Sequence, residues 1–345
     1  MALWGNMKKL TLEMLAQMAG VGVATVDRVL NERGGVSPVT ARKVLQAARE
    51  LGLKRVLPEE YKHPWHIEVI LSGNGSYFFK QLAQDFSEIA SGLGYQRVKL
   101  SRTFIAESDP EKLARHIVKC SESRDGIIVF AHDHAAVYDA LTLCSERAVP
   151  VITIVTDLPG APRLCHVGIN QLQAGRTAGL LMGRMQQQPG EVIMVSGSFD
   201  YIAHRQRIEG FRTLIQQRFP HITLREVLVG QDQREKIRQL VTEHLRQAEN
   251  VVGIYNTGSG NTEVSEALAR HNLLGKCIYI THELYSLTRR LLEDDMLYFV
   301  LDQNSRQHAQ LSMDLILRKL EENTLPDIYL SGKVDFKLIT AENYA

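Results

Sequence analysis

Polar side chains cluster just after the apolar runs in the larger, C-terminal part of this chain. The runs have the length of β-strands, as in Ile67–Leu71 and Val251–Tyr255, and amphipathic helical stretches lie between several of them. Such alternation predicts parallel sheets wrapped by helices, whose strands end at a shared edge where ligands bind. The carboxylates and amides at these ends suit a polyhydroxyl ligand. The predicted polar ligand residues, which include one hydroxyl and one imidazole, are Ser76, His132, Asp133, Asp157, Asn170, Asn256, Asn261, Glu283 and Gln303.

Motifs for other chemistry are incomplete in this chain. The segments Gly73–Gly75 and Gly258–Gly260 lack the third glycine of a dinucleotide fingerprint. His282–Glu283 is a single pair without a visible nucleophile or metal-ligand set, and no GxSxG, Walker or HExxH pattern occurs. The four cysteines form no CxxC pair, so we expect four buried free thiols. We expect no enzyme activity, no cofactor and no metal.

The first fifty residues predict three short helices. Thr11 is a plausible N-cap for a helix over Leu12–Ala19, and a second helix covers Val23–Leu30. A third runs from Ser37, as N-cap, to Leu51. A helix-turn-helix also needs particular residues at fixed places: a small residue at the helix crossing, a residue that tolerates positive φ in the turn, and apolar contacts. These places are filled by Ala16, Gly20, Leu15, Ala19, Val21, Val26 and Val29.

The segment AQMAGVGVATVDRVLN (16–31) follows the pattern A-x-x-A-G-V-S-x-x-T-V-S-R-V-L-N. Residues 9–52 resemble the head of the LacI/GalR family of transcriptional regulators. The segment 16–31 carries the resemblance, and Val36, Ser37 and Thr40 continue it. The resemblance implies a small all-α helix-turn-helix domain (8–53) and a linker (54–65). A two-lobed α/β domain like the periplasmic binding proteins, with doubly wound parallel sheets, would follow (66–345).

The resemblance places base reading at the start of the second helix. Val23 and Ala24 can offer only apolar contact, whereas Arg28 can grip a guanine through O6 and N7. Asp27 stands where the family usually has serine; it would accept from cytosine N4, hold Arg28 in place, or remain a solvated helix charge. The linker does not match the family's usual hinge. The phosphate-contact candidates are Thr11, Thr25, Asn31, Thr40, Lys54 and Arg55.

The charge distribution agrees with a head that meets DNA, since residues 1–57 carry nine Lys/Arg against four Asp/Glu. In the body, Phe78 and Phe79 resemble the aromatic pair that pentose-type binding proteins stack on a sugar. Arg207 fits the family's R-x-x-G-F arginine, and Glu283 stands where an aspartate is usual.

The resemblance thus implies a DNA-binding transcription regulator, by family habit a repressor. It would act as a homodimer on a double-stranded operator, under a sugar, polyol or sugar-acid effector. Two alternatives within the family are an activator and a regulator whose ligand is a corepressor. A third, outside the family, is the solute-binding protein of a transporter. With no apolar run of 18 residues and no apolar segment like that of a signal peptide, we expect a cytoplasmic protein without a membrane partner.

Overall fold

The computed structural model describes residues 11–31, 33, 36–53, 64–94, 97–231, 233–328 and 330–344. The chain divides into two compact units. One comprises Met1–Trp65 with Leu93–Lys99, and the other comprises His66–Gly92 with Leu100–Ala345. Most of the predicted linker, including Lys54 and Arg55, lies outside the described residues.

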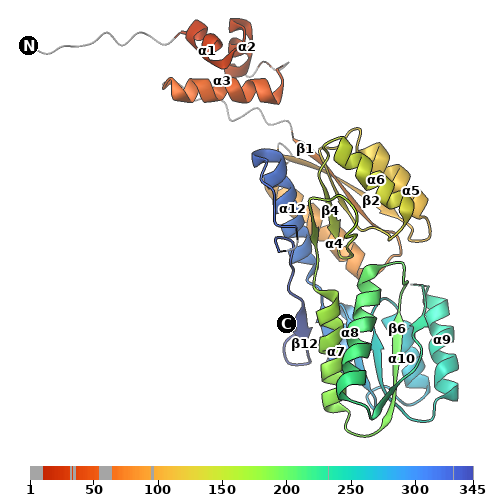
Figure 1. The fold of residues 1–345 in the computed structure, drawn as a ribbon. Coiled ribbons are helices and arrows are strands. Elements are labelled where there is room, and N and C mark those ends of the chain that lie inside the picture. Colours follow the sequence, from red (N-terminus) through yellow and green to blue (C-terminus); the bar gives the residue numbers. More distant parts are fainter. Residues whose placement is uncertain are drawn as a thin grey trace, which may run out of the picture. The chain divides into compact units, whose positions relative to one another are not determined.

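The head consists of the three expected helices, α1 (Leu12–Ala19), α2 (Val23–Leu30) and α3 (Pro38–Glu50) (Figure 1). The Thr11 hydroxyl accepts a hydrogen bond from the Met14 amide at 3.4 Å and so caps α1. Gly20 ends this helix with φ of 66°, the left-handed conformation for which a glycine was expected. The helices close on a core of their own, which confirms the predicted helix-turn-helix. Its fully or nearly buried members are Leu15, Ala16, Ala19, Val26, Val29, Leu30, Ala41, Val44, Leu45, Ala47 and Ala48.

The first lobe of the body is built on a five-stranded sheet of order β2-β1-β3-β4-β5. The central pairs are parallel, and apolar strand residues such as Ile67, Val69 and Ile128 are fully buried, as in a sheet covered on both faces. Its strands are β1 (Trp65–Ser72), β2 (Val98–Ile105), β3 (Gly126–Val129), β4 (Val151–Ile154) and β5 (Cys165–Val167). Its helices are α4 (Tyr77–Leu93), α5 (Pro110–Cys120), α6 (Ala135–Glu146) and α12 (Ser305–Glu322).

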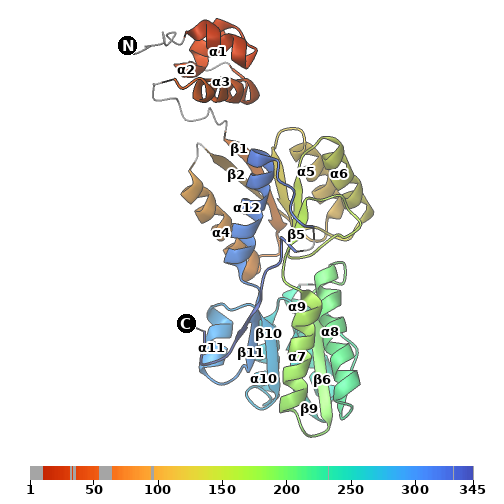
Figure 2. The ribbon, with the colours of Figure 1, turned by 60° about the vertical axis from the view of Figure 1, so that its left-hand side comes forward.

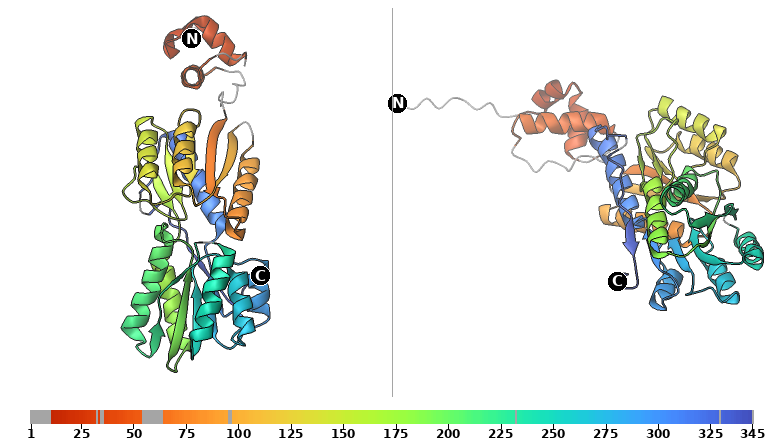
Figure 3. Two further views of the ribbon diagram at one scale, coloured as in Figure 1. Left: turned by 90° about the vertical axis from the view of Figure 1, so that its right-hand side faces the viewer. Right: turned by 60° about the horizontal axis from the view of Figure 1, so that its bottom comes forward.

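The second lobe has a sheet of order β12-β11-β10-β9-β6-β7, with β8 also paired to β6. Only β12 runs antiparallel among the described pairings. Its strands are β6 (Gly190–Ser196), β7 (Ile222–Leu224), β8 (Leu228–Val229), β9 (Val251–Asn256), β10 (Ile278–His282), β11 (Phe299–Asp302) and β12 (Lys337–Ile339). Its helices are α7 (Gln171–Met185), α8 (Ile202–Arg218), α9 (Arg234–Gln247), α10 (Asn261–Arg270) and α11 (Ser286–Glu293). Figure 3 shows helices on either side of each sheet, so the predicted two-lobed α/β class is confirmed.

The helices α7 and α8 pack closely because glycines face the contact. A Cβ on Gly175 would lie 2.0 Å from the carbonyl oxygen of Arg207, and one on Gly210 would lie 2.2 Å from that of Leu172. Larger residues would therefore push α8 away from α7. The two glycines help to fix the backbone that carries Arg207.

The chain passes between the lobes more than once. It enters the second lobe at α7, returns to the first with α12, which packs on β3, β4 and β5, and ends in the second lobe with β12 (Figure 2). The alternation of strand and helix patterns in the sequence predicts a boundary between the two lobes near Asp157–His166. This is slightly too early, because the three-residue strand β5 still belongs to the first sheet. No helix among the described residues is long and apolar enough to span a membrane.

Candidate DNA-reading surface and ligand cleft

The start of α2 presents the residues expected to read bases. Val23, Ala24 and Arg28 are all exposed. Ala24 and Arg28 are four residues apart and therefore share one face of the helix. The face combines a small apolar patch with one long cation, as the predicted thymine and guanine contacts require.

Asp27 is engaged within the head. Its carboxylate accepts a hydrogen bond from the Asn31 amide at 2.7 Å and pairs with the Arg33 guanidinium at 2.8 Å. Because Arg28 is the next residue along the helix, its side chain points in another direction. In this structure Asp27 thus holds Asn31 and Arg33, and its action on Arg28 or on a cytosine stays a prediction.

The expected phosphate contacts differ in how free their hydroxyls are. Thr11 is exposed but caps α1, Thr25 is half-buried, and the Thr40 hydroxyl lies 2.8 Å from that of Ser37, which caps α3. Their contacts with DNA stay predictions.

A cavity of about 280 Å³ lies between the two lobes of the body. Both lobes contribute to its wall, and the lobes also touch around it. The predicted ligand residues that line it are Ser76, Phe78, Phe79, Arg207, Asn261, Glu283 and Gln303.

Aromatic rings form one side of the cavity. Phe78 and Phe79, in the first turn of α4, meet edge to face at 5.4 Å between centroids, and Phe79 lies 4.6 Å from Phe130. Both phenylalanines are only 7% exposed, so each belongs to the core and borders the cavity. Tyr77 of the first lobe stacks on Tyr285 of the second at 5.1 Å. Such rings offer flat apolar surfaces to the C–H faces of a sugar.

Arg207 is the buried cation of the cavity wall. Its Nε donates to Gln171 Oε1 and its Nη1 donates to the Thr257 carbonyl, both at 2.6 Å. Gln171 in turn donates to the Val155 carbonyl at 3.0 Å and to Gln303 at 3.2 Å. Burial lowers the pKa of Arg207, but arginine stays charged in proteins. The guanidinium thus ties α7 to the loop after β9, and Gln171 extends this network to Val155, which follows β4.

Glu283 is a partly buried acid of the cavity wall. Burial, followed by the nearby Asp302, raises the pKa of its carboxyl to about 8, so it is largely protonated at neutral pH and can donate a hydrogen bond. Gln303 Nε2 donates to its Oε1 at 2.5 Å. Its φ of 68°, like the 70° of Val155 in the opposite wall, lies in the left-handed region that non-glycine residues avoid. Such strain is typical of functional sites.

We expect the protonated state of Glu283 to make stability depend on pH. In the unfolded chain the carboxyl titrates near 4.5, whereas in the folded protein it titrates near 8. Its favourable contribution is complete below pH 4.5 and is lost as the pH rises through 8, at up to about 1.4 kcal/mol per pH unit. Glu283→Gln should therefore gain thermal stability over the wild type as pH rises from 5 to 8. Parallel melting curves of the two proteins at each pH would contradict this.

Asn261, at the start of α10, is a node of polar contacts. Its Oδ1 accepts hydrogen bonds from Asn256 Nδ2 at 2.7 Å, from Tyr279 at 2.7 Å and from Thr281 at 2.6 Å. Asn256 itself is fully buried and accepts from the Gly258 amide at 3.3 Å. Asn256 therefore shapes the loop that borders the cavity and does not line the cavity itself.

Two other predicted residues lie behind the cavity wall and join the lobes. The His132 ring is hydrogen-bonded to the hydroxyl of Tyr201, which does line the cavity. Asp133 pairs with Arg205 of α8 at 2.6 Å and accepts from Tyr138 at 3.0 Å. Together with the Tyr77–Tyr285 stack, these contacts hold the lobes closed.

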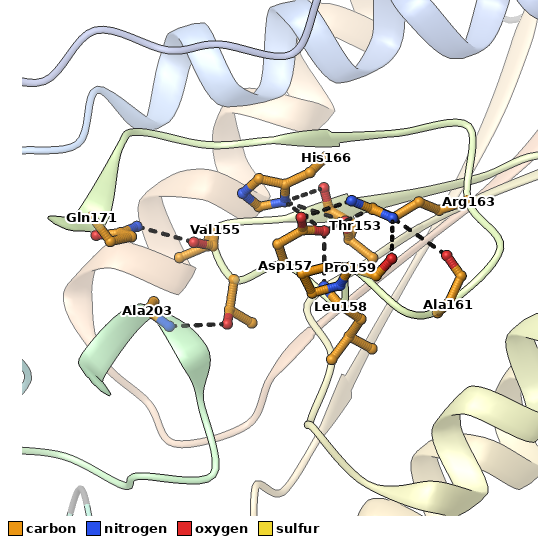
Figure 4. Close-up of polar contacts among 11 residues, drawn as sticks. Thr153, Val155, Asp157, Leu158, Pro159, Ala161, Arg163, His166, Gln171 and Ala203 are labelled. Carbon is orange, nitrogen blue, oxygen red and sulfur yellow. Dashed lines mark hydrogen bonds and ion pairs between the residues drawn. The ribbon is translucent and has the colours of Figure 1, made fainter. Parts of the chain in front are cut away.

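Asp157 and Asn170 lie away from the cavity lining. Asp157 pairs with Arg163 at 2.7 Å and accepts from Thr153 at 3.0 Å, within the network of Figure 4. Asn170 is exposed and caps α7 by accepting from the Gln173 amide at 2.9 Å. Both positions follow strands, as predicted, but their side chains stabilise local backbone.

Sequence reasoning missed several cavity residues. Glu107 follows β2, which alternates polar and apolar residues and so has no apolar run to mark it. The other cavity residues can be recognised as strand-end residues only when the course of the turns after the strands is known. The cavity residues without a prediction include Asn74, Tyr77, Glu107, Phe130, Tyr201, His204, Arg234, Thr257, Glu263, His282 and Tyr285.

The fold and the cavity define a two-lobed ligand-binding body that shares its chain with a helix-turn-helix head. Residues 67–324 match the periplasmic binding protein domain, and residues 11–55 match the bacterial regulatory proteins of the lacI family. The chain belongs to the LacI family of bacterial regulatory proteins.

Relatives with known names are transcription regulators. The HTH-type transcriptional regulator DegA of Bacillus subtilis is 26% identical over 220 residues, which are 61% of each chain. The ribose operon repressor of Halalkalibacterium halodurans is 38% identical over 88 residues, 25% of this chain and 27% of the repressor. The chain thus matches about three fifths of DegA's length.

Solved structures share the fold of the body. GanP, a glucose-galactose binding protein from Geobacillus stearothermophilus, superposes with a TM-score of 0.73 at 18% identity, over 82% of this chain and 99% of that one. A transporter solute-binding protein from Burkholderia graminis, in complex with D-arabinose, superposes with a TM-score of 0.74 at 20% identity, over 82% of this chain and 97% of that one. At these identities the likeness concerns the fold alone.

Proposed function

We propose that this protein is a transcription regulator that binds operator DNA through its head and a small polyhydroxyl effector in its cleft. The observation that carries the proposal is the presence, in one chain, of an exposed reading surface at the start of α2 and a cavity walled by aromatic rings and polar groups. Linkage then requires that effector and operator change each other's affinity by the same factor.

The charges around the cavity favour an uncharged sugar or polyol over a sugar acid. Two nitrogens of the Arg207 fork are already engaged by Gln171 and Thr257, and Arg234 pairs with Glu263 at 2.7 Å. Glu283 is neutral near pH 7 because burial raises its pKa to about 8. The cavity of about 280 Å³ is just below the roughly 300–1,000 Å³ of sites for drug-sized ligands, which suits a monosaccharide.

Further parts of the proposal follow from the relatives and from geometry. The names of the ribose and sucrose operon repressors support repression, with activation as the alternative. A single small head reads few bases, so we infer a homodimer on two half-sites. We also infer a cytoplasmic protein, because operator DNA lies in the cytoplasm of bacteria such as those of its relatives, and we infer no catalysis, since those relatives are named as regulators.

The test is a binding measurement on the full-length protein. Fluorescence anisotropy with DNA from upstream of its own gene, and with scrambled DNA, should show a preference for one segment. A panel of neutral sugars, polyols and sugar acids is then added, with thermal shift as a second readout. One neutral compound should raise the melting temperature and change operator affinity about 5- to 150-fold, the usual range of allosteric coupling. A sugar that binds while no DNA segment is preferred would instead support a solute-binding protein.

A further inference from the structure

Three side chains with metal-binding atoms converge in the first lobe, apart from the residues that line the cavity. Glu68 lies on β1 and is 1% exposed. His116 and Cys120 lie on α5, four residues apart, and so share the face that meets the sheet. The ligand atoms of these three residues all lie within 4.8 Å of one another.

Two of the three distances between ligand atoms match those around a tetrahedral ion, and the third, between Glu68 and Cys120, is within 4.8 Å. His116 Nε2 lies 3.4 Å from Glu68 Oε1 and 3.4 Å from Cys120 Sγ. In a tetrahedral zinc site, with Zn–S of about 2.3 Å and Zn–N and Zn–O of about 2.0–2.2 Å, neighbouring ligand atoms are about 3.3–3.6 Å apart. The side chains therefore need little movement to surround an ion.

A proton relay fits the same contacts less well. In a cysteine–histidine–carboxylate relay, the two partners of the imidazole occupy different ring nitrogens. Here both partners face Nε2, which in a neutral ring is either a donor or an acceptor. An ion at the shared point would meet a lone pair from each of the three residues.

The surroundings orient the carboxylate and leave a way in. Arg124 Nε donates to Glu68 Oε2 at 2.9 Å, and the Thr103 hydroxyl donates to Oε1 at 2.6 Å. Such outer partners of ligating carboxylates are usual, and Oε1 retains a second lone pair. The His116 side chain is 27% exposed, so an ion can enter and a water can complete the tetrahedron.

We propose that Glu68, His116 and Cys120 form a binding site for a divalent transition-metal ion, with Zn²⁺ the ion that this mixed ligand set suits best. A bound ion would link α5 to β1 and stabilise the first lobe. The site does not depend on the proposed effector or on DNA.

The test uses the full chain without a histidine tag, reduced and treated with a chelator. Titration with Co²⁺ should give one ion per chain, with d–d bands of a tetrahedral site and a thiolate-to-cobalt charge-transfer band. Zn²⁺ should displace Co²⁺, and it should raise the melting temperature. Absence of binding at one equivalent would overturn the proposal.

Variants separate this site from adventitious binding. Cys120→Ser should abolish the charge-transfer band. His116→Gln, at a partly exposed position, should lower the affinity for Co²⁺ by more than about 100-fold, which exceeds the effect of losing an outer partner of a ligand. Cys277→Ser, which alters a buried thiol in the second lobe, should bind like the wild type. Unchanged spectra in both His116→Gln and Cys120→Ser would refute the assignment, and the His116 variant decides alone if the cysteine variant does not fold.

Discussion

Arg28→Ala is expected to remove most of the specific affinity for operator DNA. Arg28 is the exposed cation on the reading face of α2, where Val23 and Ala24 have no hydrogen-bonding side chains. A bidentate contact to guanine discriminates by about 1–3 kcal/mol. Two half-sites would double this, so a homodimer should lose roughly 30-fold to 10⁴-fold in operator affinity. The measurement is anisotropy with operator and scrambled DNA at several salt concentrations.

The pattern of loss distinguishes base reading from general attraction. Weak, salt-sensitive binding to scrambled DNA should survive in Arg28→Ala, because phosphate contacts supply it. Arg33→Ala is the matched control, since Arg33 belongs to the same head but is paired with Asp27; it should change both affinities by a similar, smaller factor. Equal losses on both DNAs for Arg28→Ala would exclude the base-reading role.

The sequence predicts the head well because its constraints are local. Gly20 must take a positive φ, Ala16 must be small, and Thr11 and Ser37 must cap, so short patterns reveal each of them. The pairing of Asp27 with Arg33 was not predicted. It depends on how the chain turns after α2 ends, and no residue spacing encodes that direction.

The cleft is predicted less completely because strand ends fix positions, whereas side-chain directions depend on packing. Phe78 and Glu283 follow strands and border the cavity. Asp157 also follows a strand, but Arg163, six residues later, draws its carboxylate away. Glu107 follows a strand that has no apolar run, so the sequence pattern does not predict it as a cavity residue. Contacts between distant segments, such as Asp133 with Arg205, need the closed three-dimensional arrangement.

Arg207→Lys is expected to weaken effector binding while operator binding remains. Lysine keeps the charge but lacks the planar fork, so it cannot serve Gln171 and the Thr257 carbonyl together. Each lost hydrogen bond to a charged group removes about 1.5–3 kcal/mol of stabilising free energy. The walls on both sides of the cavity then lose the hydrogen-bond network that connects them. Effector affinity should fall by at least about 10-fold for one such bond. Thermal shift and effector titration of the operator complex would measure both effects.

Arg212→Lys is the matched control, because Arg212 lies on the same helix and is exposed. It should bind effector and operator like the wild type, which separates loss of the buried fork from any general effect of changing arginine in α8. Operator binding by Arg207→Lys must also stay within a few-fold of the wild type, since the head folds on its own core. If Arg207→Lys responded normally to the effector, the guanidinium would be a structural tie only. The specificity of the cleft would then have to come from Glu283, Asn261 and the aromatic wall.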